Sequence, residues 1–484
     1  MPVRHFSTTP KAGYRSAALI ALALSLGGCA NFAGIGPKAR MADPQAMAPR
    51  SATILATPAP TAPAQAQAAW WTRFGDTQLD ALVQQALQTH PNMRLAQARV
   101  ARAQALTEAA GSSETPNVNA SVDGTRQRFS ANGIYPPPLA GGVYETANAQ
   151  VTATYEFDLF GKNRAALDVA LGLTRAAQAD AQAAELLLAT QVTRGYFNVL
   201  RLTELQSLAQ RNLDQREQLV ALVQSRLAAG LDSPSELRNS ESSLPELRQY
   251  AESLREQVAL ARNALAALTG QALDLPDLKP GKLTAIVGQP APQALPLDLL
   301  ANRPDVAAAR ARVEAGLSEV EVAKAQFYPN INLVAFAGFN SLGFGNISKA
   351  GSEQWGVGPA VRLPIFDGDR LRAQLKGKSA DVDMAIESYN ALVLEAAREV
   401  ADQVATLQSL ERQRQEQRSG QASAQGLYDI AAQRFAAGLG SRASLLNAQF
   451  AVLNQERIGV ELAARALDAQ TQLLRATGGD IAAH

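Results

Sequence analysis

Apolar and polar residues alternate along four short segments, which predicts four β-strands. Each segment has about ten residues, with one apolar face and one small or polar face, as in a strand that crosses a membrane between lipid and water. A half-buried hairpin of a soluble protein alternates in the same way, so any one pair leaves both interpretations open. The apolar positions are Val118, Ala120 and Val122; Val151, Ala153, Tyr155 and Phe157; Ile331, Leu333, Ala335, Ala337 and Phe339; and Trp355, Val357, Val361 and Leu363.

The four segments group into two β-hairpins, over about 117–158 and 331–365. Their connecting segments, 130–145 and 341–353, are rich in Gly and Pro and are predicted to be exposed loops. Pro359 has no backbone N–H, so it must face a gap in the hydrogen-bond ladder. Four strands cannot close a barrel, and an open sheet edge is not tolerated in lipid, so a membrane barrel would need several chains.

Long helices are predicted after each hairpin, over about 162–229 and 368–437, because both ranges are free of proline. The first would span roughly 100 Å at 1.5 Å per residue, far more than a compact core. Each must therefore pack along a partner, and shorter helices over about 234–269 and 442–476 would supply it.

A 3.5-residue repeat in the second half predicts a coiled-coil seam, with Gln403 occupying one apolar step. A plain coiled-coil rod remains an alternative if the helices are considered alone. The seam positions are Val382, Ile386, Tyr389, Val393, Ala396, Val400 and Leu407.

Glycines mark the predicted tips of the helical hairpins. Gly230 and Gly438 follow the long helices and fit the left-handed position that ends a helix. Asp232 and Gly440 continue the two turns, and Ser441 supplies an N-cap for the returning helix. The tips therefore lie near 230–232 and 438–440.

The chain repeats itself with a period near 210 residues, which predicts two structural repeats over 70–295 and 296–484. The matching segments occur in the same order in both halves. They are His90-Pro91-Asn92 with Arg303-Pro304-Asp305, Pro116-Asn117 with Pro329-Asn330, Leu159-Phe160 with Ile365-Phe366, and Arg226 to Leu231 with Arg434 to Leu439.

The N-terminus resembles a lipoprotein signal. Positive residues precede an apolar run over 17–26, which is too short for a membrane span and typical of a signal peptide over 1–28. Leu26-Gly27-Gly28-Cys29 resembles a lipobox, in which the cysteine is acylated. Residues 29–69 are rich in Ala, Pro and Gln and are expected to form a lipid-anchored tether without a core of its own.

Composition excludes several classes of function. A net charge of +1 argues against a nucleic-acid binder. The lone cysteine and three scattered histidines argue against a metal site, and no cofactor is expected. No Ser/His/Asp set or nucleotide loop occurs, so an enzyme is not expected. Paired acids such as Asp381 and Asp383 are interpreted as solvated charges on a helix face.

In order and duplication, these motifs resemble the outer-membrane efflux protein family, in the lipoprotein branch of TolC-like exit ducts. The resemblance covers nearly the whole chain from Cys29. Further motifs that carry it are Trp70-Trp71, Phe74-Gly75-Asp76, Phe157-Asp158-Leu159-Phe160-Gly161, Phe327-Tyr328-Pro329 and Pro364-Ile365-Phe366.

The resemblance implies a mainly α-helical protein with a transmembrane β component. It implies a homotrimer with a twelve-stranded β-barrel that continues into a periplasmic α-barrel. It also implies an outer-membrane location, docking to a periplasmic adaptor, and an inner-membrane transporter, with the RND type favoured. The function implied is efflux of drugs or other small toxic compounds.

The family gate lies at the periplasmic hairpin tips, where aspartates often ring the constriction. Ser444 and Asn447 occupy those places here, which argues against a strong cation-binding gate. Hydrogen bonds and packing of Leu445 and Leu446, with Leu237 at the other tip, could close it instead. These residues could equally serve only helix packing.

Two rival functions remain at this level. The same duct could serve type I protein secretion. A periplasmic coiled-coil adaptor or scaffold lipoprotein is a rival of another class, although the duplicated pattern does not favour it.

Overall fold

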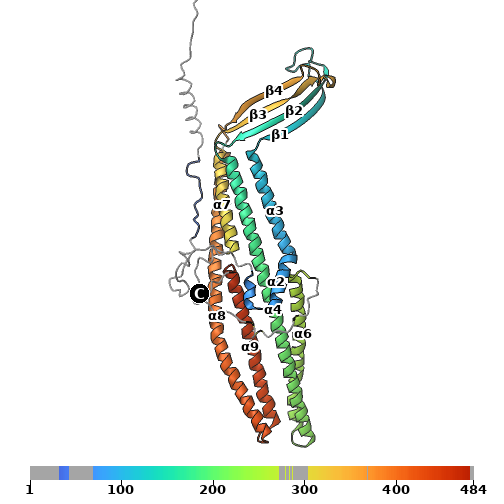
Figure 1. Ribbon diagram of the computed structural model, residues 1–484, viewed down its shortest axis with the longest axis vertical. Coiled ribbons are helices and arrows are strands. Elements are labelled where there is room, and N and C mark those ends of the chain that lie inside the picture. The colour runs from blue at the N-terminus through green and yellow to red at the C-terminus, as the bar shows by residue number, and fades with distance from the viewer. Residues whose placement is uncertain are drawn as a thin grey trace, which may run out of the picture. The chain divides into compact units, whose positions relative to one another are not determined.

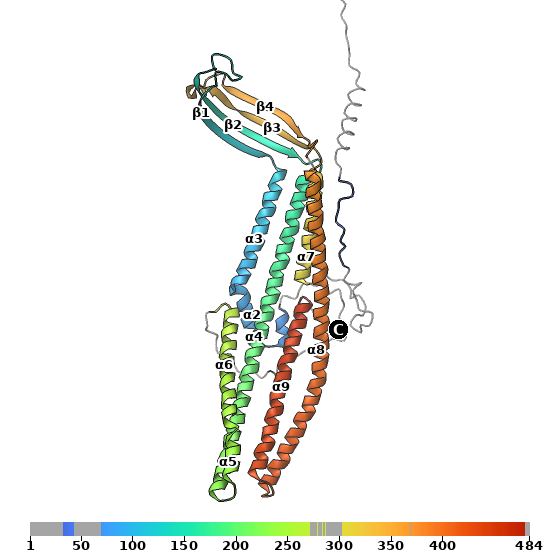
Figure 2. The ribbon, with the colours of Figure 1, turned by 180° about the vertical axis from the view of Figure 1, so that it is seen from behind.

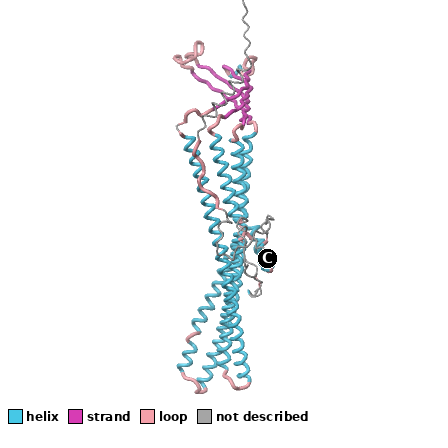
Figure 3. Tube along the Cα trace, turned by 90° about the vertical axis from the view of Figure 1, so that its left-hand side faces the viewer, coloured by secondary structure: helices cyan, strands magenta, loops and turns pink. Residues whose placement is uncertain are grey.

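The computed structural model describes residues 32–42, 69–271, 278, 283, 286, 303–367 and 369–479. The chain divides into two compact units. The strand unit comprises Val100–Ala177 and Ala309–Ser388 with the chain up to Met41, and the hairpin unit comprises the remainder. The described strands belong to the strand unit, and the hairpin unit is built from helices and loops (Figure 3).

One antiparallel sheet contains both hairpins, in the order β1-β2-β3-β4 (Figure 1). Its strands are β1 (Asn117–Arg128), β2 (Val143–Phe157), β3 (Asn330–Leu342) and β4 (Glu353–Arg362). β2 and β3 join the two halves of the sequence, and β1 and β4 are the edges. Pro359 lies on edge strand β4, where a missing donor is tolerated.

The connecting loops are shorter than the sequence pattern predicts. Val143 to Glu145 pair with Arg128 to Arg126, so these residues belong to strands instead of to the expected loop 130–145. Ser341 and Leu342 likewise end β3, opposite Ala147 and Thr146. The reason is that backbone hydrogen bonding to the neighbouring strand continues beyond the residues whose apolar and polar side chains alternate.

Helices of the strand unit pack through small residues. α7 (Pro304–Ala325) lies against α4 (Lys162–Ala228), where a side chain at Gly172 would collide with Ala315. It also lies against α8 (Arg370–Ala436), where Gly316 faces Val382. α3 (Pro91–Gly111) packs on α4, and the hydroxyl groups of Thr107 and Thr174 lie 2.8 Å apart.

Two helical hairpins form most of the hairpin unit (Figure 2). In one, α4 returns through α5 (Pro234–Glu241) and α6 (Leu244–Leu268); in the other, α8 returns through α9 (Arg442–Ala476). A short 3-10 helix, Trp70–Phe74, and α2 (Thr77–Thr89) pack on them. The shared core includes Trp71, Leu79, Val83, Val192, Tyr196, Leu265 and Leu467.

The predicted single helix over 234–269 is instead two helices. α5 ends at Glu241, and α6 begins at Leu244 with Pro245 in its first turn. Proline lacks the N–H that a continuous helix needs and clashes with the preceding turn, so the break falls just before it.

The predicted seam of α8 is buried, with one correction. Val404 is 3% exposed and takes the step assigned to Gln403, which stays partly exposed. Val404 lies four residues after Val400 and three before Leu407, so the apolar repeat is unbroken. A membrane-crossing helix is not found among the described residues.

The N-terminal segment 32–42 lies against α8, which corrects two expectations. Backbone N–H groups of Lys38 and Ala39 donate to Asp383 Oδ1 at 2.6 and 2.8 Å, so Asp383 is not merely a solvated charge. The Phe32 ring also lies 5.7 Å from that of Phe327. This part of the tether is therefore docked, whereas the signal peptide over 1–28 and Cys29 lie outside the described residues.

Candidate functional site: an amphipathic sheet and two helix-hairpin tips

One face of the sheet is apolar and uncovered. The strand register aligns its apolar positions in rows, for example Ala120, Val151, Ala337 and Trp355. Val122 is 81% exposed and Trp355 is 79% exposed. An uncovered apolar face of this kind marks a surface that meets lipid or protein.

The apolar rows have the length of a strand that crosses a membrane. They extend from Ala149 to Phe157 along β2, which is nine residues. A tilted strand that crosses a membrane in a barrel has about 9–11 residues. The match favours lipid as the medium around this face.

The opposite face is lined with amide and hydroxyl groups. Gln354 Nε2 donates to Asn148 Oδ1 and to Gln150 Oε1, both at 3.0 Å, and Gln150 Nε2 donates to Thr152 Oγ1 at 2.8 Å. This ladder crosses from β4 to β2 over Gly338 of β3. Such a surface suits contact with water.

Aromatic side chains gather where the strands meet the helices. The rings of Phe160 and Tyr328 stack at 4.6 Å with an interplanar angle of 7°. Tyr155 and Phe157 form an edge contact at 5.1 Å, and Phe32 also lies beside Tyr328. Aromatic groups with polar neighbours are typical of the boundary between lipid and water.

The first hairpin tip is closed by a local ion pair. Gly230 adopts a φ of 73°, and the Leu231 N–H donates to the Arg226 carbonyl at 2.8 Å, as in a Schellman ending. Arg226 Nε and Nη2 donate to the two carboxylate oxygens of Asp232 at 2.8 and 3.0 Å. This guanidinium lowers the pKa of Asp232.

The second tip repeats the backbone but not the ion pair. Gly438 has a φ of 72°, and the Leu439 N–H donates to the Arg434 carbonyl at 2.8 Å. Gly440 stands where the first tip has Asp232, so the Arg434 guanidinium reaches only the Leu439 carbonyl, at 3.5 Å, among the described residues. The second tip is therefore held by fewer side-chain hydrogen bonds than the first.

The candidate gate residues occupy different environments. Ser444 and Asn447 are exposed and one helical turn apart, so they share a face of α9. Ser444 also serves the N-cap, since its N–H donates to Ser441 Oγ at 3.1 Å. Leu445 and Leu237 are partly exposed. No group of three or more metal-ligating side chains occurs in the described part of the chain.

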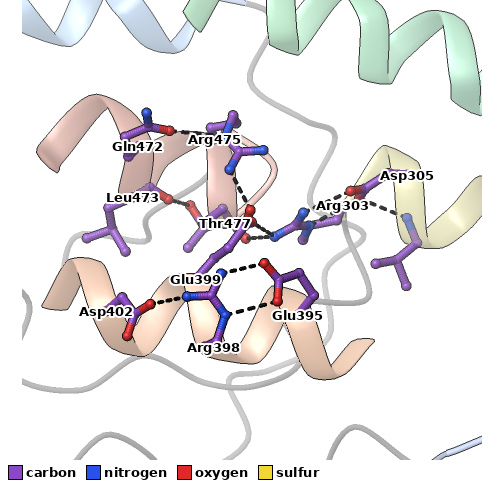
Figure 4. Close-up of polar contacts among 12 residues, drawn as sticks. Arg303, Asp305, Glu395, Arg398, Glu399, Asp402, Gln472, Leu473, Arg475 and Thr477 are labelled. Carbon is purple, nitrogen blue, oxygen red and sulfur yellow. Dashed lines mark hydrogen bonds and ion pairs between the residues drawn. The ribbon is translucent and has the colours of Figure 1, made fainter. Parts of the chain in front are cut away.

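A buried ionic cluster centred on Arg303 was not predicted from the sequence (Figure 4). Arg303 is 4% exposed and bonds to Asp305 Oδ2 and Glu399 Oε2 at 2.8 Å and to the Ala476 carbonyl at 3.4 Å. Arg475 completes the cluster by donating to Glu399 Oε1 at 2.7 Å. Arg303-Pro304-Asp305 stood out only as a repeated motif, because its other partners are distant in the sequence.

The carboxylates of this cluster are held ionised. Burial raises the pKa of Glu399, but hydrogen bonds and charges from Arg303 and Arg475 outweigh it, so the net pKa is lowered from 4.5. The pKa of Asp305 is lowered from 3.8 by Arg303 against the same opposing burial. The cluster ties the start of α7 to α8 and to the end of α9.

A second buried polar contact holds the segment before α2. The fully buried Tyr196 donates from its hydroxyl to Asp76 Oδ2 at 2.6 Å. Asp76 also caps α2 by accepting from the Gln78 N–H at 2.9 Å. Burial and the Asp76 carboxylate raise the pKa of Tyr196, so it stays a donor.

Comparisons with known proteins agree with this arrangement. The family model described as "Outer membrane efflux protein" matches residues 82–271 and 295–479. The chain is 36% identical over 378 residues to the fusaric acid resistance protein FusA of Burkholderia cepacia, covering 76% of this chain and 70% of FusA. It is 32% identical to the putative multidrug resistance outer membrane protein MdtQ of Escherichia coli K12, covering 85% and 87%.

Solved structures show the same fold. The outer membrane protein VceC of Vibrio cholerae matches with a TM-score of 0.75 and 30% identity, covering 85% of this chain and 98% of VceC. The outer-membrane channel OprN matches with a TM-score of 0.78 and 25% identity, covering 92% and 99%. The predicted fold class, mainly α with a β component, is confirmed. The chain belongs to the outer membrane efflux protein family and is an outer-membrane efflux channel with a periplasmic part, not an enzyme.

Proposed function

We propose that three copies of the chain close the sheet into a twelve-stranded β-barrel around a wet lumen. The observation that carries this proposal is the four-stranded sheet with two unpaired edges and an uncovered apolar face. Edges left open in lipid would expose backbone N–H and C=O groups that nothing there can satisfy. Further copies would supply the missing partners.

The helical hairpins would line the periplasmic continuation of this channel. We take residues 70–295 and 296–484 as the two repeats, each contributing one hairpin with a tip. At these tips the channel would meet a periplasmic adaptor and, through it, an inner-membrane transporter of the RND type. The resistance names of FusA and MdtQ support drugs or other small toxic compounds as cargo.

The gate would lie at the second tip. Its side chains there are Ser444, Leu445 and Asn447, with Leu237 at the other tip, and none is acidic. The absence of the Arg–Asp ion pair at the second tip supports assigning it the larger movement, because fewer contacts must break. Gly230 and Gly438 would set where each tip turns.

Acylation of Cys29, after removal of residues 1–28, would anchor each copy in outer-membrane lipid. Phe32 packs beside Tyr328, next to the start of β3. Cys29 is three residues earlier in the sequence.

Deletion of the gene and analysis of membrane fractions test the proposal. We expect a cross-linked trimer in the outer membrane and greater susceptibility to drugs after deletion, restored by the wild-type chain. Loss of the acyl group in C29A should weaken the anchorage. A monomer confined to the inner membrane would contradict the proposal.

A further inference from the structure

The contact between the two repeats inside one chain is a template for a contact between neighbouring chains. In the strand unit, the second strand of repeat one, β2, pairs with the first strand of repeat two, β3. The chain leaves the second strand of repeat two, β4, and the first strand of repeat one, β1, without outer partners. The two free edges are therefore a second strand, β4, and a first strand, β1. The β2–β3 pair inside the chain also joins a second strand to a first strand.

The exposure of strands and aromatic side chains also differs between the two repeats. β1 is exposed along its whole length, whereas its counterpart β3, which has a neighbour on either side, is mostly partly buried. Phe160 stacks on Tyr328 and is 43% exposed, whereas its counterpart Phe366 is 92% exposed. β1 lacks a preceding repeat in the same chain, and Phe366 lacks a following one, so in each comparison the side without a neighbouring repeat is the uncovered one.

The paired strands of the two hairpins can be matched residue by residue. Asn117 of β1 corresponds to Asn330 of β3 in the sequence repeat. Asn117 pairs with Thr154, and Asn330 pairs with Arg362, so Thr154 corresponds to Arg362. The neighbouring residue Ala153 therefore corresponds to Val361.

The register of the β2–β3 pair inside one chain then gives the register expected between β4 and β1 of neighbouring copies. Ala153 pairs with Ala335 across the β2–β3 contact. Ala153 corresponds to Val361, and Ala335 corresponds to Val122, because β1 and β3 are offset by 213 residues (330 − 117). We infer that β4 of one copy pairs antiparallel with β1 of the next, with Val361 opposite Val122 of the neighbouring copy.

This register fits the side chains of the apolar face. Val122 and Val361 both belong to the apolar rows, so apolar side chains of the two copies meet on the same face at this pair. Toward the end of the strands near the loops, Trp355 falls opposite Arg128 of the neighbouring copy, where a guanidinium can lie against the indole. An interface that repeats head to tail forms a ring when its rotation closes, as a barrel requires.

Disulfide cross-linking tests the register, which rests on the proposed trimer. Native Cys29 is first replaced, and V361C is combined with V122C or with A120C, two residues away. Directly opposed Cα atoms lie about 4.5–5.5 Å apart, within disulfide range, whereas diagonal neighbours are about 7–8 Å apart. We expect on the order of ten-fold more covalent trimer from V361C/V122C than from V361C/A120C.

The internal pair A153C/A335C is the matched control, since it should form a disulfide within one chain and no covalent oligomer. A second test joins F366C to T115C with a short bismaleimide, because Thr115 corresponds to Tyr328, the partner of Phe160. A trimer by size whose best cross-link is V361C/A120C, or that shows none, overturns the register alone. A monomer with the control disulfide formed overturns both the register and the trimer.

Discussion

Arg303 shows how one residue can hold three helices together. Its side chain is 4% exposed and is shared between Asp305, Glu399 and the carbonyl that ends α9. A buried cation surrounded by fitted acceptors is costly to remove, because the acceptors lose their partner without regaining water. His90 is the counterpart of Arg303 in the first repeat. Its side chain makes a contact within the same motif, where Nδ1 accepts from the Asn92 N–H at 3.2 Å.

Replacement R303A should therefore lower the free energy of unfolding by about 3–5 kcal/mol, measured by denaturant titration of the purified channel. R398A is the matched control, because Arg398 lies on the exposed side of the same region and pairs with Glu395 and Asp402. Exposed ion pairs contribute little to stability, because water screens the two charges. Equal effects of the two changes would contradict the role assigned to Arg303.

Acid should weaken the same cluster. The pKa values of Asp305 and Glu399 are lowered from 3.8 and 4.5 in the folded state, so their contribution is present at pH values above these and is lost as pH falls through the lower folded values. Thermal stability of the channel should fall across this acid range. In E399Q the fall should be shallower, and an unchanged slope would argue against the assignment.

At the scale of elements, side-chain acceptors on a helix help to hold an extended segment against it. Asp383 accepts two backbone N–H groups from residues 38–39, and Asn390, one heptad later on α8, accepts one from Ala42 at 2.7 Å. Hydrogen bonds to a charged group contribute about 1.5–3 kcal/mol each.

Substitution D383A should release this segment. Amide hydrogen exchange of Lys38 and Ala39 should rise at least about ten-fold, since 1.4 kcal/mol corresponds to a factor of ten. D381A is the control, because Asp381 contacts Lys378 in the strand unit, at 3.5 Å. Equal protection in D383A and the wild-type chain would refute the docking role of Asp383.

The uncharged tip of the α8–α9 hairpin leads to a prediction about block of the channel by cations. Ser444 and Asn447 carry no charge, so trivalent cations should block single-channel conductance weakly in planar bilayers. The double change S444D/N447D would place six carboxylates in a trimer and should lower the blocking concentration by on the order of ten-fold or more, as attraction between unlike charges requires. S423D, on an exposed part of α8, is the control, and strong block of the wild-type channel would contradict the proposed gate.

At the scale of the whole molecule, membrane insertion depends on one face of one sheet. V151R places a charge on the apolar face, whereas T152R places it one residue away on the polar face. A lipid-facing arginine costs about 2–4 kcal/mol near the membrane centre, whereas a water-facing one is tolerated. Outer-membrane yield should fall markedly for V151R and little for T152R; equal loss would argue against the assignment of faces.

Sequence alone predicted the duplicated plan, the alternating strands and the long proline-free helices, because each depends on local periodicity. It also singled out Gly230 and Gly438, since a turn with positive φ leaves a local signature. Its errors had local causes as well: Pro245, which separates α5 from α6, was overlooked, and the seam step at Val404 was assigned to Gln403.

Only the tertiary structure decided which distant residues meet. The pairing of β2 with β3, the cluster around Arg303 and the docking of residues 38–39 on Asp383 all join positions far apart in the chain. Periodicity shows which face of an element is apolar, but not which element covers that face. That choice comes from packing and hydrogen bonding across the folded chain, where desolvated charges and strand edges must find their partners.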